Sequence, residues 1–313
     1  MEFIPKDRIF ESKPDTLQYI RKQHNLEKPG QMKESIKILR DWVSKQSHFK
    51  KKDFIDHYYE FMIISCKGSI ERAKSCIDKM CTMRTLLPQY FGYCNVKKEF
   101  RYIFDIVYTV IMPKLTDDHH RVEILKFHDA DFKASQYMDY FKTTVPLCEY
   151  ICAHDYMDGI IMILDFSEAN IMNYISKVNP IELKQAMCLY IDGYGLRIKA
   201  IRLVTTSKFI DIIISIAKQV LNPKVAERFH IHKSIEELYD HIPKRLLPKD
   251  YGGDEPSLKE LQMNWLDALS SEEHLEYMRE INEACTDEDY RRRDNFNEHC
   301  AGMPGTFRLL SVD

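Results

Sequence analysis

Two adjacent segments determine the architecture of this chain: Arg197-Ile-Lys-Ala-Ile-Arg-Leu-Val204 and Lys208-Phe-Ile-Asp-Ile-Ile-Ile-Ser-Ile-Ala-Lys-Gln-Val-Leu221. The first predicts a short strand and the second a strongly apolar helix. A second strand is predicted within Lys224-Val-Ala-Glu-Arg-Phe-His-Ile-His232. The unit ends at Leu247-Pro-Lys-Asp-Tyr-Gly-Gly253, where Pro and Gly interrupt regular structure. This order of strand, helix and strand is typical of an α/β fold.

Strand-like and helix-like patterns also alternate before this unit. Residues 121–127 alternate as a strand, and residues 160–166 are apolar on both faces. A strand that is apolar on both faces belongs inside a parallel or mixed sheet covered by helices. Helical patterns are predicted over residues 101–111, 131–152 and 180–190. The chain is therefore expected to form an α/β sandwich with a mostly parallel sheet.

The N-terminal part is predicted to be a small all-α domain. Ile36, Leu39, Trp42 and Val43 recur at helical spacing, and this pattern continues to Pro88. We expect four parts along the chain: an N-terminal segment (1–30), a helical N-terminal domain (31–95), a sheet domain (96–253), and a C-terminal surface helix with an ordered tail (254–313).

Composition narrows the class of protein. Of 313 residues, 44% are hydrophobic and 30% are charged, which is the balance of a globular domain. The net charge of −3 gives no global support for a nucleic-acid partner. Nine cysteines without C-x-x-C spacing, and no apolar run near the length of a membrane span, favour a cytoplasmic protein, expected to be a monomer.

The apolar helix over residues 208–221 has two interpretations. A narrow polar stripe lies opposite a broad apolar face, which is formed by Ile210, Ile213, Ile214, Ala217 and Leu221. One interpretation is a helix buried in the core. The other is a lid that closes a lipid cavity and swings out to touch a bilayer.

Two pairs of basic residues flank this helix. Arg197 and Lys199 alternate on a strand, so both side chains point to one side. Lys224 and Arg228 have helical i, i+4 spacing and would share a face. Four converging cations suit an inositol phosphate head group, although exposed Lys and Arg are most often solvated surface charges.

These segments resemble the CRAL-TRIO lipid-binding family, in the branch that contains α-tocopherol transfer protein and retinaldehyde-binding protein. The match is carried by Gly159-Ile-Ile-Met-Ile-Leu-Asp165, Gly195-Leu-Arg-Ile-Lys-Ala-Ile201, the segment Lys224 to His232 and the closing Leu-Pro…Tyr-Gly-Gly motif. The helical part resembles the family's N-terminal domain, and residues 305–313 are similar to the end of insect members. Residues 96–253 would then be the lipid-binding domain, whose sheet and helices enclose an apolar cavity.

The resemblance implies a carrier of one hydrophobic ligand beneath a mobile gate helix, with exchange at membranes that contain phosphoinositides. It implies no cofactor and no catalytic residue. The implied ligand-binding residues are Phe141, Thr144, Cys148, Ile160, Met162, Leu164, Leu189, Tyr194, Ile201, Ile210, Ile213, Ile214, Ala217 and Leu221. The implied phosphoinositide-binding residues are Arg197, Lys199, Lys224 and Arg228. A tocopherol, retinoid, carotenoid or other isoprenoid is the first ligand class by resemblance, and phosphatidylinositol or phosphatidylcholine the second.

The sequence leaves other functions open. A lipid sensor would use the C-terminal extension to bind a protein partner, and a lipid-modifying enzyme would need an acid–base or nucleophile pair that the sequence does not offer. His230 and His232 share one strand face, but no third ligand is tied to them, so no metal site is expected. The chain departs from the family at Gly195, where Pro is usual, and at residues 205–207, where Asn-x-Pro is usual. These departures affect the geometry of the hinge of the gate helix, because a hinge without Pro is less constrained.

Overall fold

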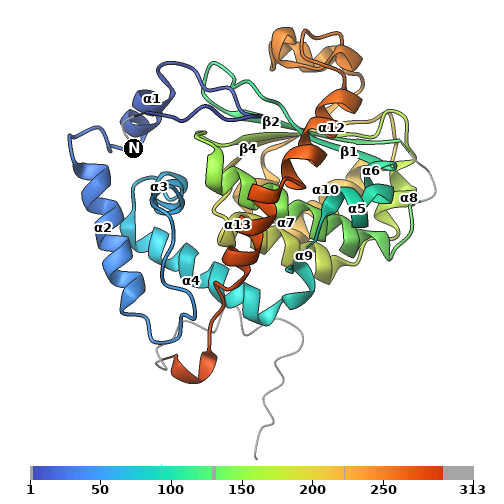
Figure 1. The fold of residues 1–313 in the computed structure, drawn as a ribbon. Coiled ribbons are helices and arrows are strands. Elements are labelled where there is room, and N and C mark those ends of the chain that lie inside the picture. Colours follow the sequence, from blue (N-terminus) through green and yellow to red (C-terminus); the bar gives the residue numbers. More distant parts are fainter. Residues whose placement is uncertain (1–2, 93, 129–131, 222, 292–313) are drawn as a thin grey trace, which may run out of the picture.

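The computed structural model describes residues 3–92, 94–128, 132–221 and 223–291, and the side chains of Ile210 and Val220 lie outside the description. A helical N-terminal part is followed by a region of sheet and helices, and two more helices run back across the molecule (Figure 1). None of the helices within these ranges combines the length and apolar character that crossing a bilayer requires.

The N-terminal part is all-helical, as predicted. Ile36, Leu39 and Val43 are buried on the inner face of one helix, because their spacing places them on a single stripe. Three of the helices pack against one another around these side chains. The helices are α1 (Thr16–Gln23), α2 (Gln31–Ser44), α3 (Asp56–Ser65) and α4 (Ile70–Leu86).

A five-stranded sheet forms the centre of the molecule, with the strands in chain order. The first strand is antiparallel to the second, and all other neighbours are parallel, which confirms the predicted mostly parallel sheet. The strands are β1 (Val107–Ile111), β2 (Arg121–Phe127), β3 (Ile160–Asp165), β4 (Ile198–Val204) and β5 (Phe229–His232).

The helix predicted over residues 101–111 was wrong in its second half. The structure has a one-turn helix α6 (Arg101–Phe104), and the chain then extends as β1. Val107, Thr109, Val110 and Ile111 are β-branched, and such side chains pack better on a pleated sheet than on a helix.

The two faces of the sheet are covered differently. Three helices lie together on one face (Figure 1): α7 (Gln136–His154), α9 (Pro180–Cys188) and α10 (Ile210–Val220). On the other face the Tyr251 hydroxyl donates a 2.5 Å hydrogen bond to Asp165 at the end of β3. Asp165 also accepts a hydrogen bond from the backbone N–H of Ser167, so it stabilises the turn that follows β3.

Short helical segments complete the connections between these elements. They are η1 (Pro88–Tyr90), α5 (Val96–Glu99), α8 (Ile171–Ile175), the π-helical turn η2 (Leu189–Gly193), α11 (Pro223–Ala226), η3 (Glu236–Asp240), η4 (Lys244–Leu246), η5 (Lys249–Tyr251) and η6 (Glu288–Tyr290).

The C-terminal extension contains two helices, α12 (Leu258–Leu269) and α13 (Glu272–Asn282). A capping box between Ser257 and Glu260 starts α12. On α12, Lys259 and Glu260 are exposed, whereas Trp265 is buried and its Nε1 donates a 2.9 Å hydrogen bond to the carbonyl of Ile111. This extension therefore covers the edge of the sheet at β1. The predicted tail over residues 305–313 lies outside the described residues.

A buried ion pair joins the helical part to the sheet region. Arg84 of α4 donates a 2.5 Å hydrogen bond to Glu149 of α7, and both side chains are about 1% exposed. The hydroxyls of Tyr194 and Tyr277 donate to the same carboxylate. Three segments that lie far apart in sequence thus meet at one side chain.

Candidate functional site

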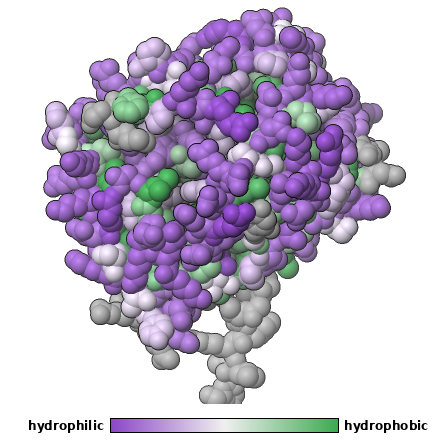
Figure 2. All heavy atoms as spheres, in the orientation of Figure 1, coloured by the Kyte–Doolittle hydropathy of each residue, from purple (hydrophilic) through white to green (hydrophobic). Residues whose placement is uncertain are grey.

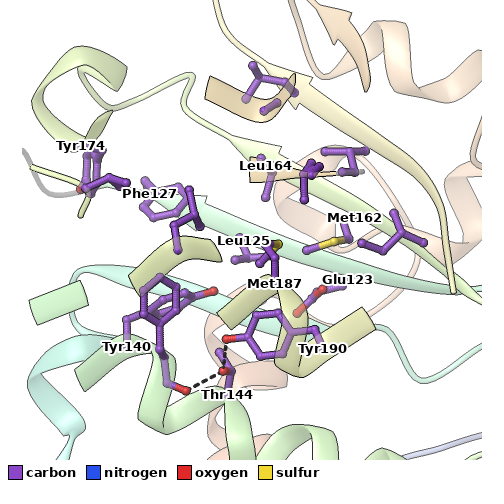
Figure 3. A pocket seen from close by; sticks show the side chains of 18 of the residues that line it. Glu123, Leu125, Phe127, Tyr140, Thr144, Met162, Leu164, Tyr174, Met187 and Tyr190 are labelled. Atoms are coloured by element: carbon purple, nitrogen blue, oxygen red, sulfur yellow. Dashed lines mark hydrogen bonds between the residues drawn. The ribbon is translucent and has the colours of Figure 1, made fainter. Parts of the chain in front are cut away.

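An apolar cavity of about 270 Å³ lies between the sheet and helices α7, α9 and α10 (Figure 3). Its floor is formed by alternating side chains of the strands, such as Ile160, Met162 and Leu164 of β3. Alternation places every second residue of a strand on the same face, so the apolar run of β3 serves both the cavity and the opposite face. Burial of apolar ligand surface in such a space is favourable.

The structure places most of the sequence-derived ligand residues at this cavity. Those that line it are Phe141, Thr144, Cys148, Ile160, Met162, Leu164, Ile201, Ile213, Ala217 and Leu221. They come from α7, β3, β4, α10 and the residue after α10, which are separated by long stretches of sequence. The side chain of Ile210 lies outside the described part.

Three of the sequence-derived residues are elsewhere. Ile214 of α10 is half-buried and is not among the lining residues that the structure describes. Leu189 and Tyr194 are fully buried on the side of the helical part, beyond the cavity wall. The π-helical turn η2 changes the phase that a regular α-helix from Pro180 would have given these residues. Tyr194 instead donates a 2.8 Å hydrogen bond to Glu149.

The hydroxyls of Thr144 and Tyr190, which both line the cavity, are hydrogen-bonded to each other. Thr144 donates a 2.7 Å hydrogen bond to the carbonyl of Phe141, one turn earlier. Its hydroxyl oxygen lies 2.5 Å from the Tyr190 hydroxyl, which therefore acts as the donor of that pair (Figure 3). Neither hydroxyl hydrogen is left for a ligand.

Glu123 of β2 is the one lining residue of the described chain that carries an acidic or basic side chain. Burial among apolar groups raises its pKa to about 7. Glu123 was not among the residues predicted from the sequence, although a signal for it existed. Glu123 is in phase with Leu125 and Phe127 on the strand, so an acidic residue occupies a position that the alternation assigns to the apolar face.

Helix α10 is apolar on both sides. Ile213, Ile216 and Ala217 face the cavity, whereas Phe209 and Ile212 are 52% and 43% exposed. The outer apolar residues have no cover within the described chain, which is unusual for a helix packed into a core. By contrast, the face of the molecule in Figure 2 is mostly hydrophilic, with hydrophobic residues in small separate groups.

The four basic residues predicted to bind phosphoinositides differ in their contacts and exposure. Arg197 and Lys199 each donate a 2.7 Å hydrogen bond to the carboxylate of Asp158, and Lys224 is exposed. Arg228 donates to the carbonyl of Ile198, which directs its guanidinium to the sheet edge. The predicted helical face shared by Lys224 and Arg228 was wrong, because α11 ends at Ala226.

Two further cations complete a basic cluster that we define as Lys67, Arg72, Arg197, Lys199 and Lys224. Partial burial lowers the pKa of Lys67, and the charges of the other four members lower it further. Lys67 follows α3, Arg72 lies in α4, Arg197 and Lys199 lie just before and within β4, and Lys224 lies in α11. Sequence spacing therefore did not reveal Lys67 and Arg72 as members.

Asp158 is the counter-ion at this cluster, and a signal for it was present in the sequence. It precedes Gly159 and β3, while Arg197 precedes the parallel neighbour β4. Parallel strands begin at the same edge, so these two residues must lie close together. Gly159 has a φ of +140°, and a Cβ there would lie 2.6 Å from the Lys199 side chain, which crosses it to reach Asp158.

His230 and His232 do not form part of a metal site within the described ranges. No group of three or more His, Cys, Asp or Glu side chains is arranged to hold a metal ion there. The His232 ring is engaged by Arg202, whose Nη1 lies 3.2 Å from Nε2.

Comparisons with known proteins agree with this architecture. The family model described as "CRAL/TRIO domain" matches residues 94–253, and "Pinta-like, UBA domain" matches residues 28–100. The α-tocopherol transfer protein-like protein of Mus musculus is 31% identical over 118 residues, 37% of this chain and 34% of that protein. Its Homo sapiens counterpart is 32% identical over 98 residues, 31% of this chain and 28% of that protein.

The matched segment thus spans about a third of the length of these curated relatives. Among solved structures, the crystal structure of Sfh5 aligns with a TM-score of 0.45 at 9% identity, over 87% of this chain and 98% of that one. The CRAL/TRIO match covers about half of the residues, including the whole sheet and the cavity described above. This chain therefore belongs to the CRAL/TRIO domain family.

Proposed function

We propose that this protein is a carrier, not an enzyme, that holds one hydrophobic molecule in the cavity beneath α10 and exchanges it at anionic membranes. The observation that carries the proposal is the apolar cavity between the sheet and three helices. Burying each methylene of a ligand gains about 0.8 kcal/mol, so a long hydrocarbon chain binds tightly with few polar contacts.

The preferred ligand class is a tocopherol, retinoid, carotenoid or other isoprenoid. Relatives named α-tocopherol transfer protein-like support this choice. The lining supports it as well, because its one charged side chain within the described residues is acidic. An acidic side chain would repel a phosphate, so phosphatidylinositol or phosphatidylcholine is the less favoured ligand.

Exchange at the membrane is assigned to α10 and the basic cluster. Phe209 and Ile212 would insert into the membrane–water interface. Lys224 and the other residues of the basic cluster would bind phosphoinositide head groups. We place the protein in the cytoplasm as a peripheral, monomeric carrier. The eight described cysteines are free thiols, which suits a reducing compartment.

Filling the cavity tests the carrier function. Ala217→Phe puts a ring into the cavity from α10, whereas Ser215→Phe puts the same ring on the exposed side of that helix. We expect A217F to lose most uptake of radiolabelled α-tocopherol and retinol from vesicles, and S215F to keep it. Circular dichroism verifies that both variants fold. Full uptake by folded A217F would contradict the proposal.

Charge reversal tests the membrane step. Lys224→Glu acts on an exposed member of the basic cluster, and Lys259→Glu is a matched change at an exposed position on α12. With vesicles containing phosphatidylinositol bisphosphate, K224E should slow ligand transfer several-fold, since each cation near such a surface contributes about 1 kcal/mol. K259E should transfer at the wild-type rate. Equal rates for the two variants would rule out head-group engagement by this cluster.

A further inference from the structure

Glu123 occupies an unusual position for a carboxylate. It lies in the middle of the sheet, paired with Met162 of β3 on one side and Ile111 of β1 on the other. Its side chain points into the cavity near Met162 and Tyr190 (Figure 3). The part of the Glu123 side chain that protein atoms do not cover therefore faces the interior of the cavity.

The carboxylate of Glu123 has no partner within the described chain, in contrast to the other buried acids. Asp155 pairs with Arg121, Glu149 with Arg84, and Asp165 accepts from a tyrosine. Glu123 has neither a hydrogen bond nor an ion pair among the described residues, and burial alone raises its pKa. An unpaired buried carboxyl group is costly to retain in a fold.

The groups that face Glu123 are neutral. Tyr140 and Cys148 approach it from α7 and Tyr190 from η2, and the charge of Glu123 raises the pKa of each, after the larger effect of burial. No cation faces it from the described part of these elements. The Tyr190 and Thr144 hydroxyl hydrogens are already used within the protein. The Glu123 carboxylate therefore offers a ligand acceptor oxygens that no cation of the described chain engages.

We propose that Glu123 binds the polar end of the ligand, so that the cavity selects a hydrophobic molecule ending in a hydrogen-bond donor, an alcohol or an amine. This inference rests on the proposed carrier function. A donor satisfies the buried carboxylate and removes its desolvation cost, whereas an ester or a hydrocarbon leaves that cost in place. An ammonium group adds charge pairing to the hydrogen bond.

The test compares three ligands with the same hydrocarbon chain: oleyl alcohol, oleylamine and methyl oleate. Each is radiolabelled and equilibrated between the protein and phosphatidylcholine vesicles at about pH 8, where a group with a pKa near 7 is mostly ionised. We expect wild type to prefer the alcohol and the amine over the ester by about ten-fold, because a hydrogen bond to a charged group contributes that much.

Two substitutions and one control assign the preference to Glu123. Glu123→Leu should bind methyl oleate at least as well as wild type and lose the ten-fold preference. Glu123→Gln keeps the size of the side chain and should lose the extra affinity for the amine. Glu276→Leu makes the same change at an exposed position on α13, away from the cavity, and should keep both preferences. Circular dichroism verifies folding, and E123Q provides the test if E123L does not fold.

The outcomes separate this inference from the carrier function. Equal partition of the three ligands into wild type, or a preference that survives in E123L, overturns the role of Glu123 and leaves the carrier function standing. Failure of wild type to take up any of the three ligands overturns both. At about pH 5 the protonated acid can donate to the ester carbonyl, so the preference over methyl oleate should narrow.

Discussion

Lys199 donates a 2.7 Å hydrogen bond to Oδ2 of Asp158, and this contact neutralises a cation on the surface assigned to membrane head groups. Arg197 bonds to the other carboxylate oxygen. Burial opposes ionisation of Asp158, but the surrounding side chains of His120, His24, Lys199 and Arg197 together hold its pKa well below the usual range. The acid therefore stays charged and competes with any anionic head group.

Removing this counter-ion should strengthen membrane binding. Asp158→Asn leaves Arg197 and Lys199 without their carboxylate, and we expect at least a five-fold gain in affinity for phosphoinositide vesicles, at about 1 kcal/mol per released cation. Co-flotation with the vesicles measures the gain. Asp117→Asn, at an exposed carboxylate that pairs with Lys13 and Arg245, is the matched control. Unchanged flotation of D158N would contradict the assignment of this surface.

The stability of the folded chain should depend on pH through Glu123. Its pKa rises from an ordinary value of 4.5 to about 7 in the fold, so the folded state holds the proton more tightly than the unfolded state. The contribution of this group is greatest below pH 4.5 and is lost as the pH rises to about 7. Relative to Glu123→Gln, wild type should lose up to about 3 kcal/mol between about pH 5 and 8 in urea unfolding. A constant difference would show that Glu123 is not buried as described.

His57 should act in the opposite direction. Burial lowers its pKa from 6.5 to about 4, and its Nδ1 lies 3.0 Å from the Tyr156 hydroxyl. The folded state resists protonation, so the stability from this group is present above pH 6.5 and is lost as the pH falls towards 4. Replacement by a side chain that does not titrate, His57→Gln, should flatten acid unfolding across this interval. Identical acid transitions for wild type and H57Q would refute this expectation.

The ion pair between Arg84 and Glu149 should be a strong determinant of stability. Glu149→Gln leaves the Arg84 guanidinium buried without its counter-charge, and breaking a buried pair in this way costs about 3–5 kcal/mol. The double variant Arg84→Met with Glu149→Gln removes the stranded charge and should recover part of that loss. Urea unfolding of the three proteins measures both effects. A double variant less stable than E149Q alone would contradict the argument.

Much of the fold could be predicted from local pattern. The strands over residues 121–127, 160–166 and 198–204 and the apolar helix over 208–221 were predicted from the sequence, and the structure has β2, β3, β4 and α10 there. The error at residues 107–111 arose because tertiary packing decides there: these residues gain their strand from pairing with β2.

The candidate site was predictable where neighbouring residues share a regular element. The α7 and β3 lining residues follow from helical and strand spacing, combined with the family resemblance. Leu189 and Tyr194 could not be placed, since one π-helical turn changes their direction. Gly195 has a φ of +68°, which Pro cannot adopt, and this accounts for the departure from the family pattern there. Asp158 and Lys67 join the site only through contacts between distant elements.

The burial of Trp265 against β1 has a spectroscopic consequence. The chain has two tryptophans, and the other, Trp42, packs edge-on to Phe49 in the helical part. Neither of them lines the cavity. Single-tryptophan variants therefore provide one intrinsic fluorophore for each half of the molecule. The emission of each reports the unfolding of its own half, without direct quenching by a ligand in the cavity.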